Sequence, residues 1–358
     1  MKQILLILVG GTICCGLNEE GTLSVSEKAG MMLCANFKKS GSPYAQKVQI
    51  DTTENMFILS ENMTVDKWNH ILDTYQEYTA KKAYDGVIIA HGTDTLAYSA
   101  ALFSMLLAGI KIPVFFVSSQ KRLELSEANG NDNFRCAVEC IARGIVPNVY
   151  VPYRNLSDGR MYLHLGSRIE QCQNYSDDFF SQGMIDITDI TEKNYRDFFA
   201  KIETLYPQKK AKPLPVAPET RLSDCVLQIK PYVGIRYDAY DYDKFSAVLH
   251  GTYHSGTACA ETDKAHSLLC MIRLCSESEH PIDAYLSPSK LSGEIYETVS
   301  TIGKSKISFL YGYTWETAYA KLLIAYSLME DSSKRATFLA TEHNFEKIDS
   351  EKTVISKE

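Results

Sequence analysis

The sequence of 358 residues predicts an α/β protein with a larger N-terminal domain built on a parallel sheet and a smaller C-terminal α/β domain. Short apolar runs alternate in its first two thirds with segments whose apolar residues recur every three or four positions. This alternation is typical of parallel strands that helices cover on both faces. A Pro- and Lys-rich segment then interrupts the pattern, and a chain of this length favours more than one domain.

The N-terminal domain, residues 1–204, is expected to contain strands at 4–9, 86–90, 114–118 and 149–152. Helical periodicity predicts helices over 66–78, 95–107 and 133–141. The first apolar run imitates a signal peptide, but it is short and passes directly into Gly10 and Gly11, which favours a buried strand. In such sheets ligands bind beyond the carboxyl ends of the strands.

Residues 205–224 have the composition of a linker, because Pro207, Pro213, Pro215 and Pro218 stand there among three lysines. Beyond it, residues 225–358 are expected to form the C-terminal α/β domain. The supporting segments are apolar stretches at 246–250 and 268–275 and an apolar helix over 315–329. The charged end, residues 344–358, is expected to be a short helix or a frayed tail.

The composition argues against several classes of protein. The formal net charge of −7 is not that of a nucleic-acid binder, which usually carries a basic stripe. No stretch is apolar for the roughly 18 residues that a membrane helix needs. Ten cysteines without a C-x-x-C pair indicate free thiols in a reducing cytoplasm. The sequence lacks the glycine motifs that bind phosphate, so we expect no cofactor. It also lacks a third metal ligand at a suitable spacing from His250 and His254, so we expect no metal.

Two predicted strands end in short polar motifs. Gly10-Gly11-Thr12 follows the first strand, and His91-Gly92-Thr93-Asp94-Thr95 follows the strand at 86–90. The glycines allow a sharp turn and bring backbone amides close to a ligand. Taken alone, the first motif is equally compatible with a tight turn or a phosphate cradle, and the second with a cap on the following helix.

Together the two motifs resemble the signatures of the bacterial-type L-asparaginase/glutaminase family, a G-G-T-I loop and a later H-G-T-D-T. Ser60 to Thr64 with Trp68, residues 129–137 and residues 312–325 are similar to further segments of that family, and the loop at 19–25 is closest to its cytoplasmic type I branch. The resemblance covers nearly the whole chain. It implies a two-domain asparaginase-like fold and an amidohydrolase that deamidates L-asparagine, or a related small amide, to L-aspartate and ammonia.

The resemblance also implies roles for catalytic residues. Thr12 would be the nucleophile that forms an acyl-enzyme, and a threonine hydroxyl needs activation by a neighbouring group. Thr93 would be the second hydroxyl, and Asp94 would hold the substrate's α-ammonium through a charge-assisted hydrogen bond. The family's catalytic lysine, counted from Gly159, falls on His164. If His164 lies in the relay, activity should rise with pH between roughly 6 and 7.

Substrate binding is assigned in the same way. Ser60 would bind the α-carboxylate, Glu61 would contact the backbone of the amino acid, and the amides around Gly11 and Gly92 would stabilise the oxyanion. Thr22 stands where relatives carry a tyrosine. The missing lysine and tyrosine leave an alternative open, an asparaginase-like amino-acid-binding protein with lost or altered catalysis. An unrelated nucleotide-binding domain is the third interpretation.

The resemblance implies partners as well. Family members form homodimers or homotetramers in which the C-terminal domain of one copy closes the active site of another. Tyr253, His254 and Ser255 would line that shared site. Asparagine, glutamine and larger amides remain open as substrates, and no nucleic-acid or membrane partner is expected.

Overall fold

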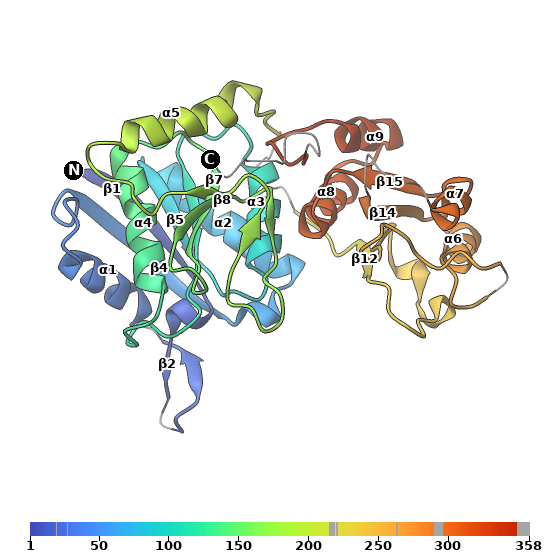
Figure 1. Cartoon of the computed structure of the whole chain (residues 1–358), viewed down its shortest axis with the longest axis horizontal. Coiled ribbons are helices and arrows are strands. Elements are labelled where there is room, and N and C mark those ends of the chain that lie inside the picture. Colours follow the sequence, from blue (N-terminus) through green and yellow to red (C-terminus); the bar gives the residue numbers. More distant parts are fainter. Residues whose placement is uncertain are drawn as a thin grey trace. The chain divides into compact units, whose positions relative to one another are not determined.

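The structure is a computed structural model that describes residues 1–18, 20–26, 28–214, 219, 221–262, 264–289 and 296–348. The chain divides into two compact units. The first comprises Met1–Thr220 with His343–Phe345, and the second comprises Arg221–Glu342 with Glu346–Glu358. Helices and strands alternate in both units, so the α/β class predicted from the sequence is confirmed (Figure 1).

The first unit is built on a seven-stranded sheet with the order β11-β8-β7-β6-β5-β1-β4. These strands are, in that order, Ile185–Asp186, Met161–Leu165, Val149–Arg154, Val114–Val117, Gly86–Ala90, Lys2–Gly10 and Val48–Ile58. The four strands expected from the sequence are β1, β5, β6 and β7, which run parallel with β4. The apolar run at 4–9 is buried between β4 and β5, with no side chain more than 4% exposed.

At one edge of this sheet the strands are antiparallel, which corrects the prediction of a parallel sheet. β8 pairs antiparallel with β7, and β11 pairs antiparallel with β8. The connection from Arg154 to Met161 is too short for the crossover that a parallel neighbour requires, so the chain folds straight back. β4, at the other edge, was not predicted because its polar and apolar residues give a weak pattern.

Helices cover both faces of the sheet. α1 (Ala29–Lys39), α4 (Gly130–Arg143) and α5 (Tyr195–Leu205) pack on the face that carries Leu6 and Phe115. On the other face lies α3 (Leu96–Leu106), whose Phe103 ring meets Phe116 edge-on at 5.5 Å. α2 (Val65–Lys81) is linked to α3 by a hydrogen bond from Trp68 to Ser99 of 2.8 Å. Helices were predicted within α2, α3 and α4.

Two small hairpins complete the first unit. β2 (Cys15–Leu17) and β3 (Leu23–Val25) pair antiparallel directly after the first strand, and Figure 1 shows this hairpin projecting from its unit. β9 (Ile169–Glu170) and β10 (Phe180–Ser181) form the second hairpin.

The second unit contains a four-stranded parallel sheet with the order β12-β13-β14-β15. Its strands are Val226–Ile229, Ala247–His250, Asp283–Ser289 and Ser308–Tyr311, and its helices α6 to α9 are Leu268–Glu277, Glu297–Gly303, Trp315–Leu328 and Ser332–Ala340. The expected apolar helix is α8, in which Ala318, Leu322 and Ile324 are fully buried.

The segments expected to be a linker and a tail are more ordered than predicted. Within 205–224, residues Gln208–Lys210 form a 3₁₀ turn, while Pro215 and Pro218 lie outside the described residues. Residues 344–348 form neither a helix nor a frayed tail, because Asn344 is buried and donates to Ser104 O and Asn148 Oδ1 at 2.8 Å. The rest of the predicted tail, 349–358, lies outside the described residues.

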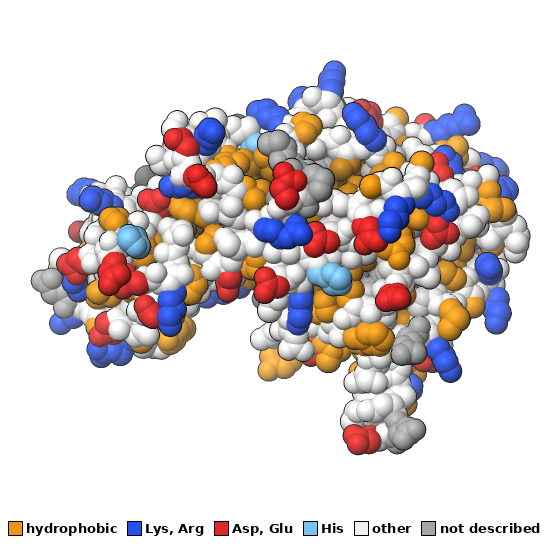
Figure 2. Space-filling model, turned by 180° about the vertical axis from the view of Figure 1, so that it is seen from behind, with side chains coloured by type: hydrophobic (Ala, Val, Ile, Leu, Met, Phe, Trp, Pro, Cys, Tyr) orange, Lys and Arg blue, Asp and Glu red, His pale blue; other side chains and the backbone are white. Residues whose placement is uncertain are grey.

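Among the described helices, none combines the length and the apolar character needed to cross a membrane. On the face seen in Figure 2, Lys and Arg side chains are interspersed with Asp and Glu.

Candidate active site

The ends of the two motif-bearing strands touch. β1 and β5 are parallel neighbours, so Gly11 and Gly92 leave the sheet at the same edge. A Cβ atom on Gly11 would lie 2.1 Å from the Cα of Gly92, and Gly11 has a φ of 74°. Only glycine fits this approach, because any side chain would overlap the neighbouring backbone.

Ser60 joins the two glycines from a third strand. It follows β4 in a 3₁₀ turn, and a Cβ atom on Gly92 would lie 2.3 Å from its Oγ. The Ser60 hydroxyl donates to Asp94 Oδ2 at 3.1 Å and accepts from the Asp94 backbone amide at 3.2 Å. The hydroxyl of Thr95 in turn donates to the Ser60 carbonyl at 2.9 Å. Ser60 is buried, whereas the Asp94 side chain reaches solvent, where it can meet a ligand.

Thr12 begins the 3₁₀ turn Thr12–Cys14 directly after Gly11 and is partly exposed. The Gly11 amide donates to the carbonyl of Ile58 at 2.9 Å, which ties this turn to the end of β4. Glu61 is exposed. Burial of the Cys15 thiol is the main cause that raises its pKa, and the negative charge of Glu61 is the second. The Glu61 carboxylate is therefore close enough to Cys15, which follows the Thr12–Cys14 turn, to act on its thiol electrostatically.

His91 lies beneath the loop and holds it. Its Nδ1–H donates to the carbonyl of Gly92 at 2.8 Å, and Nε2 accepts from the hydroxyl of Ser99 at 2.9 Å. Burial lowers the pKa of His91 to about 4, so the ring is neutral at neutral pH. This geometry suits a residue that orients the loop.

His164 is not part of this cluster. It lies in β8 opposite Val151, and its Nδ1 shares a hydrogen bond of 2.8 Å with the hydroxyl of Ser181. Its Nε2 is buried without a hydrogen-bond partner. Burial lowers the pKa of His164 to about 3, so it cannot titrate between pH 6 and 7. With this pKa, we no longer expect His164 to make activity rise between pH 6 and 7.

The same part of the chain brings a different residue to the site. Gln171, directly after β9, donates from Nε2 to the carbonyl of Thr93 at 2.7 Å and accepts at Oε1 from the amide of Ala97 at 3.3 Å. Gln171 was not predicted from the sequence, because the position of the family's lysine was counted from Gly159 without a gap in the alignment. The pairing of β9 with β10, which the sequence does not reveal, places it.

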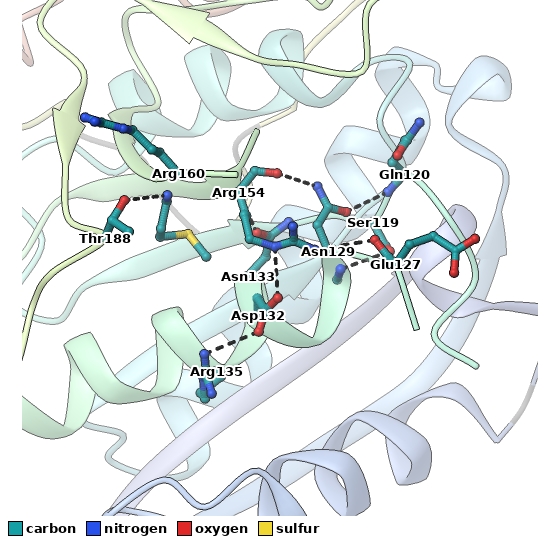
Figure 3. A network of polar contacts seen from close by, with 12 residues as sticks. Ser119, Gln120, Glu127, Asn129, Asp132, Asn133, Arg135, Arg154, Arg160 and Thr188 are labelled. Carbon is teal, nitrogen blue, oxygen red and sulfur yellow. Dashed lines mark hydrogen bonds and ion pairs between the residues drawn. The ribbon is translucent and has the colours of Figure 1, made fainter. Parts of the chain in front are cut away.

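The neighbouring strand ends are fixed by a polar network around the start of α4 (Figure 3). Asn129 accepts from the Gln120 amide at 3.1 Å and donates to the Arg154 carbonyl at 2.9 Å. Asn133 does the same between Arg154 and Ser118, at 2.8 and 3.0 Å. These bonds join the ends of β6 and β7, so residues 129–137 shape the edge of the sheet on which the candidate site lies.

The remaining candidate residues lie elsewhere. Thr22 is exposed on the β2–β3 hairpin. In the second unit, Tyr253 lines a cavity of about 570 Å³ together with residues of the segment Pro231–Tyr237. His250 is buried, and its Nε2 lies 2.7 Å from the hydroxyl of Tyr237. In the part of the chain that the structure describes, His, Cys, Asp and Glu side chains form no group of three that could hold a metal ion.

The comparison with protein families decides the relationship. A family model described as "Asparaginase, N-terminal" matches residues 3–200. The chain belongs to the asparaginase family. This confirms the resemblance drawn from the two motifs, both of which lie within the matched residues.

Solved structures of asparaginases share the fold. The chain is similar to the thermostable L-asparaginase from Thermococcus kodakarensis, with a TM-score of 0.70, 18% identity and coverage of 97% of this chain and 100% of that one. L-asparaginase I from Vibrio cholerae gives a TM-score of 0.69 and 20% identity over 97% and 99% of the two chains. The predicted asparaginase-like fold is thus confirmed.

Relatives by sequence include proteins named as a subunit of glutamyl-tRNA(Gln) amidotransferase. The protein from Methanosarcina acetivorans is 33% identical over 123 residues, which are 34% of this chain and 28% of that protein. The one from Archaeoglobus fulgidus is 26% identical over 245 residues, 67% of this chain and 56% of that protein. The chain therefore matches less than two thirds of the length of these relatives.

Proposed function

We propose that this asparaginase-family protein is an amidohydrolase that releases ammonia from the side-chain amide of L-asparagine or a closely related free amino acid. The observation that carries the proposal is the cluster of Gly11, Ser60, Gly92 and Asp94 at one edge of the sheet, with Thr12 directly beside it.

The cluster offers complementary groups for the two ends of a free amino acid. The exposed Asp94 carboxylate suits an α-ammonium group, since charge-assisted hydrogen bonds are the strong ones. In the structure the Ser60 hydroxyl donates to that carboxylate. On binding, the hydroxyl turns to the substrate's α-carboxylate, and the ammonium group replaces it on Asp94.

Thr12 would then attack the amide carbon. A bond forms between Thr12 Oγ1 and that carbon, the carbon–nitrogen bond breaks, and the nitrogen leaves as ammonia after taking up the proton that the Thr12 hydroxyl gives up. Water then cleaves the ester and regenerates the hydroxyl. Backbone amides at the two strand ends, brought close by Gly11 and Gly92, are placed to stabilise the oxyanion.

One observation favours a second candidate, an amino-acid-binding protein with lost or altered catalysis. Among the hydrogen bonds and ion pairs of the described residues, no lysine or arginine side chain reaches Thr12, Thr93 or Asp94. The group that meets the Thr93 carbonyl is the neutral amide of Gln171. A threonine nucleophile needs activation, and none of these interactions of the described residues brings a cation to Thr12.

The substrate panel separates these candidates. Ammonia release by the purified protein is measured with L-asparagine, L-glutamine and propanamide, which lacks both α groups. We expect turnover of L-asparagine and none of propanamide, because propanamide offers neither an ammonium group to Asp94 nor a carboxylate to Ser60. L-glutamine is included because the relatives are named as part of a glutamyl-tRNA(Gln) amidotransferase. Equal rates on propanamide would contradict the assigned pocket. Thermal stabilisation by L-aspartate without turnover of any amide would favour the binding protein.

The proposal includes a homo-oligomer in a reducing compartment. The ten cysteines are free thiols, as expected in the cytoplasm. A second copy would contribute the loop around Tyr253. Light scattering coupled to size exclusion should give a mass at least twice the 40.2 kDa of one chain, and a monomer would contradict shared sites.

A further inference from the structure

Gln171 connects two parts of the loop that carries Thr93 and Asp94. We propose that Gln171 is a positioning residue whose amide clamps the segment from Thr93 to Ala97. Only the expected effect of the clamp on kcat rests on the proposed function, because the clamp itself concerns the structure of the loop.

The start of α3 shows why a clamp is needed. Thr95 is the N-cap residue, but its side chain makes no capping hydrogen bond, since its hydroxyl donates to the carbonyl of Ser60 instead. The first amides of a helix have no partner within the helix. Here the Ala97 amide is satisfied by Oε1 of Gln171, from a hairpin 74 residues further along the chain.

The other end of the same side chain completes the bridge. Nε2 of Gln171 donates to the carbonyl of Thr93 at 2.7 Å, and the sulfur of Cys172 lies 3.3 Å from the same nitrogen. The segment between Thr93 and Ala97 is therefore held by Gln171 on one side and by Ser60 on the other. Ser60 holds Asp94 through its hydroxyl and Thr95 through its carbonyl.

A primary amide on a side chain of this length makes both contacts at neutral pH. It offers a donor and an acceptor on one planar group, whereas lysine offers donors alone and an ionised carboxylate acceptors alone. The backbone of Gln171 is anchored because Glu170 beside it pairs with Phe180 in the β9–β10 hairpin. The bridge fixes the backbone from which the Thr93 hydroxyl and the Asp94 carboxylate project.

Gln171→Glu gives the sharpest test, because a carboxyl group restores the donor only when it is protonated. The variant keeps the acceptor for Ala97 but sets a negative charge against the Thr93 carbonyl at about pH 8, well above the reference glutamic acid pKa of about 4.3. At about pH 5 a carboxyl group with the reference pKa is about one-sixth protonated, and the donor bond that only this form makes raises that fraction, so the clamp returns in part.

The first readout does not depend on catalysis. Hydrogen exchange of backbone amides in peptides covering residues 91–99 is measured by mass spectrometry at both pH values and corrected for the intrinsic rate. Relative to wild type, Gln171→Glu should exchange roughly tenfold faster at the higher pH, consistent with the loss of one neutral amide–carbonyl hydrogen bond, and this excess should shrink at the lower pH. Gln171→Ala should exchange faster at both.

The second readout is ammonia release from L-asparagine. If the clamp orients Thr93 and Asp94, Gln171→Glu should lose kcat and regain part of it, relative to wild type, as the pH falls. Gln173, exposed two residues further on, provides the matched controls Gln173→Glu and Gln173→Ala, which should follow wild type in both readouts.

The outcomes separate the clamp from the proposed activity. Exchange in residues 91–99 that is unchanged in both Gln171 variants overturns the clamp, whatever the activity. Faster exchange without the recovery at low pH overturns the donor–acceptor bridge and leaves a packing role. Wild-type protein that releases no ammonia overturns the proposed function, and the exchange data still decide the clamp.

Discussion

Thr12 lies where the backbone leaves a buried strand, partly exposed and beside two glycines that no larger residue could replace. If it carries the acyl group, Thr12→Ala should lower kcat for L-asparagine by at least about a thousandfold, as removal of a covalent nucleophile does. Aspartate binding, measured by thermal shift, should remain. Thr204→Ala, an exposed hydroxyl on α5, is the control and should keep full activity. Substantial turnover in Thr12→Ala would move the nucleophile elsewhere, first to Thr93.

His164 makes an independent prediction at the same scale. Because burial lowers its pKa to about 3, its ring should stay neutral from pH 5 to 8. The NMR shift of its Cε1 proton should be constant over that range. A midpoint near the reference value of about 6.5 would show that the ring meets solvent or a charge and would return it to the relay.

At the scale of elements, the contact between the ends of β1 and β5 decides the shape of the site. A methyl group at position 92 would press on the Ser60 side chain and on the backbone of Gly11. Gly92→Ala should lower the free energy of unfolding by about 3 kcal/mol, the upper range for overpacking. Gly16→Ala is the control, since its nearest non-local atom would lie 3.8 Å away. Equal urea midpoints for the two variants would contradict the close approach.

The second unit contains a buried ion pair that links α8 to the segment after α9. Nζ of Lys321 lies 2.6 Å from Oε1 of Glu346 and donates to the carbonyl of Thr341, and both charged side chains are fully buried. Burial lowers the pKa of Lys321, and the Glu346 carboxylate opposes that shift.

Removing one partner should cost more than removing both. Lys321→Met leaves Glu346 buried without its cation and should lower stability by about 3–5 kcal/mol. The double variant Lys321→Met with Glu346→Leu should be less destabilised than the sum of the single variants, because no isolated charge remains. Chemical denaturation of all four proteins gives the coupling, and additive effects would rule out a direct ion pair.

For the whole molecule, buried histidines set the response to acid. Burial lowers the pKa to about 4 for His91 and His250 and to about 3 for His164. In the unfolded chain each takes up a proton below about pH 6.5, while the folded chain keeps them neutral. The unfolded state then binds more protons, so stability falls as the pH falls below that value.

The expected size of this loss is measurable. At pH 5 each buried histidine should cost about 2 kcal/mol relative to pH 7.5, from about 1.36 kcal/mol per pH unit. Urea unfolding at the two pH values gives the difference. His164→Asn should reduce it by about one third, whereas His70→Asn, on an exposed position of α2, should not change it. Stability independent of pH between these values would contradict the neutral buried histidines.

The sequence by itself determined the fold class, the two strand-end motifs and the family. The reason is local: a fully buried parallel strand such as β1 must be apolar throughout, and a glycine is required wherever two backbones touch. Gly11 and Gly92 therefore stand out in the sequence, Ser60 and Asp94 are added by the resemblance to the family, and the structure brings these four together.

Only the tertiary structure decided those parts of the fold and of the site for which the sequence carries a weak pattern. β8 turns antiparallel, His164 shares a hydrogen bond with Ser181, and Gln171 reaches the Thr93 carbonyl. None of these follows from residue type or periodicity, because the first depends on a short connection between strands and the other two depend on the β9–β10 hairpin, whose strands have two residues each. A single gap in the alignment exchanges His164 for Gln171 as the candidate. Only the hydrogen bond between Gln171 and Thr93, which lie far apart in the sequence, identifies the residue that meets the site.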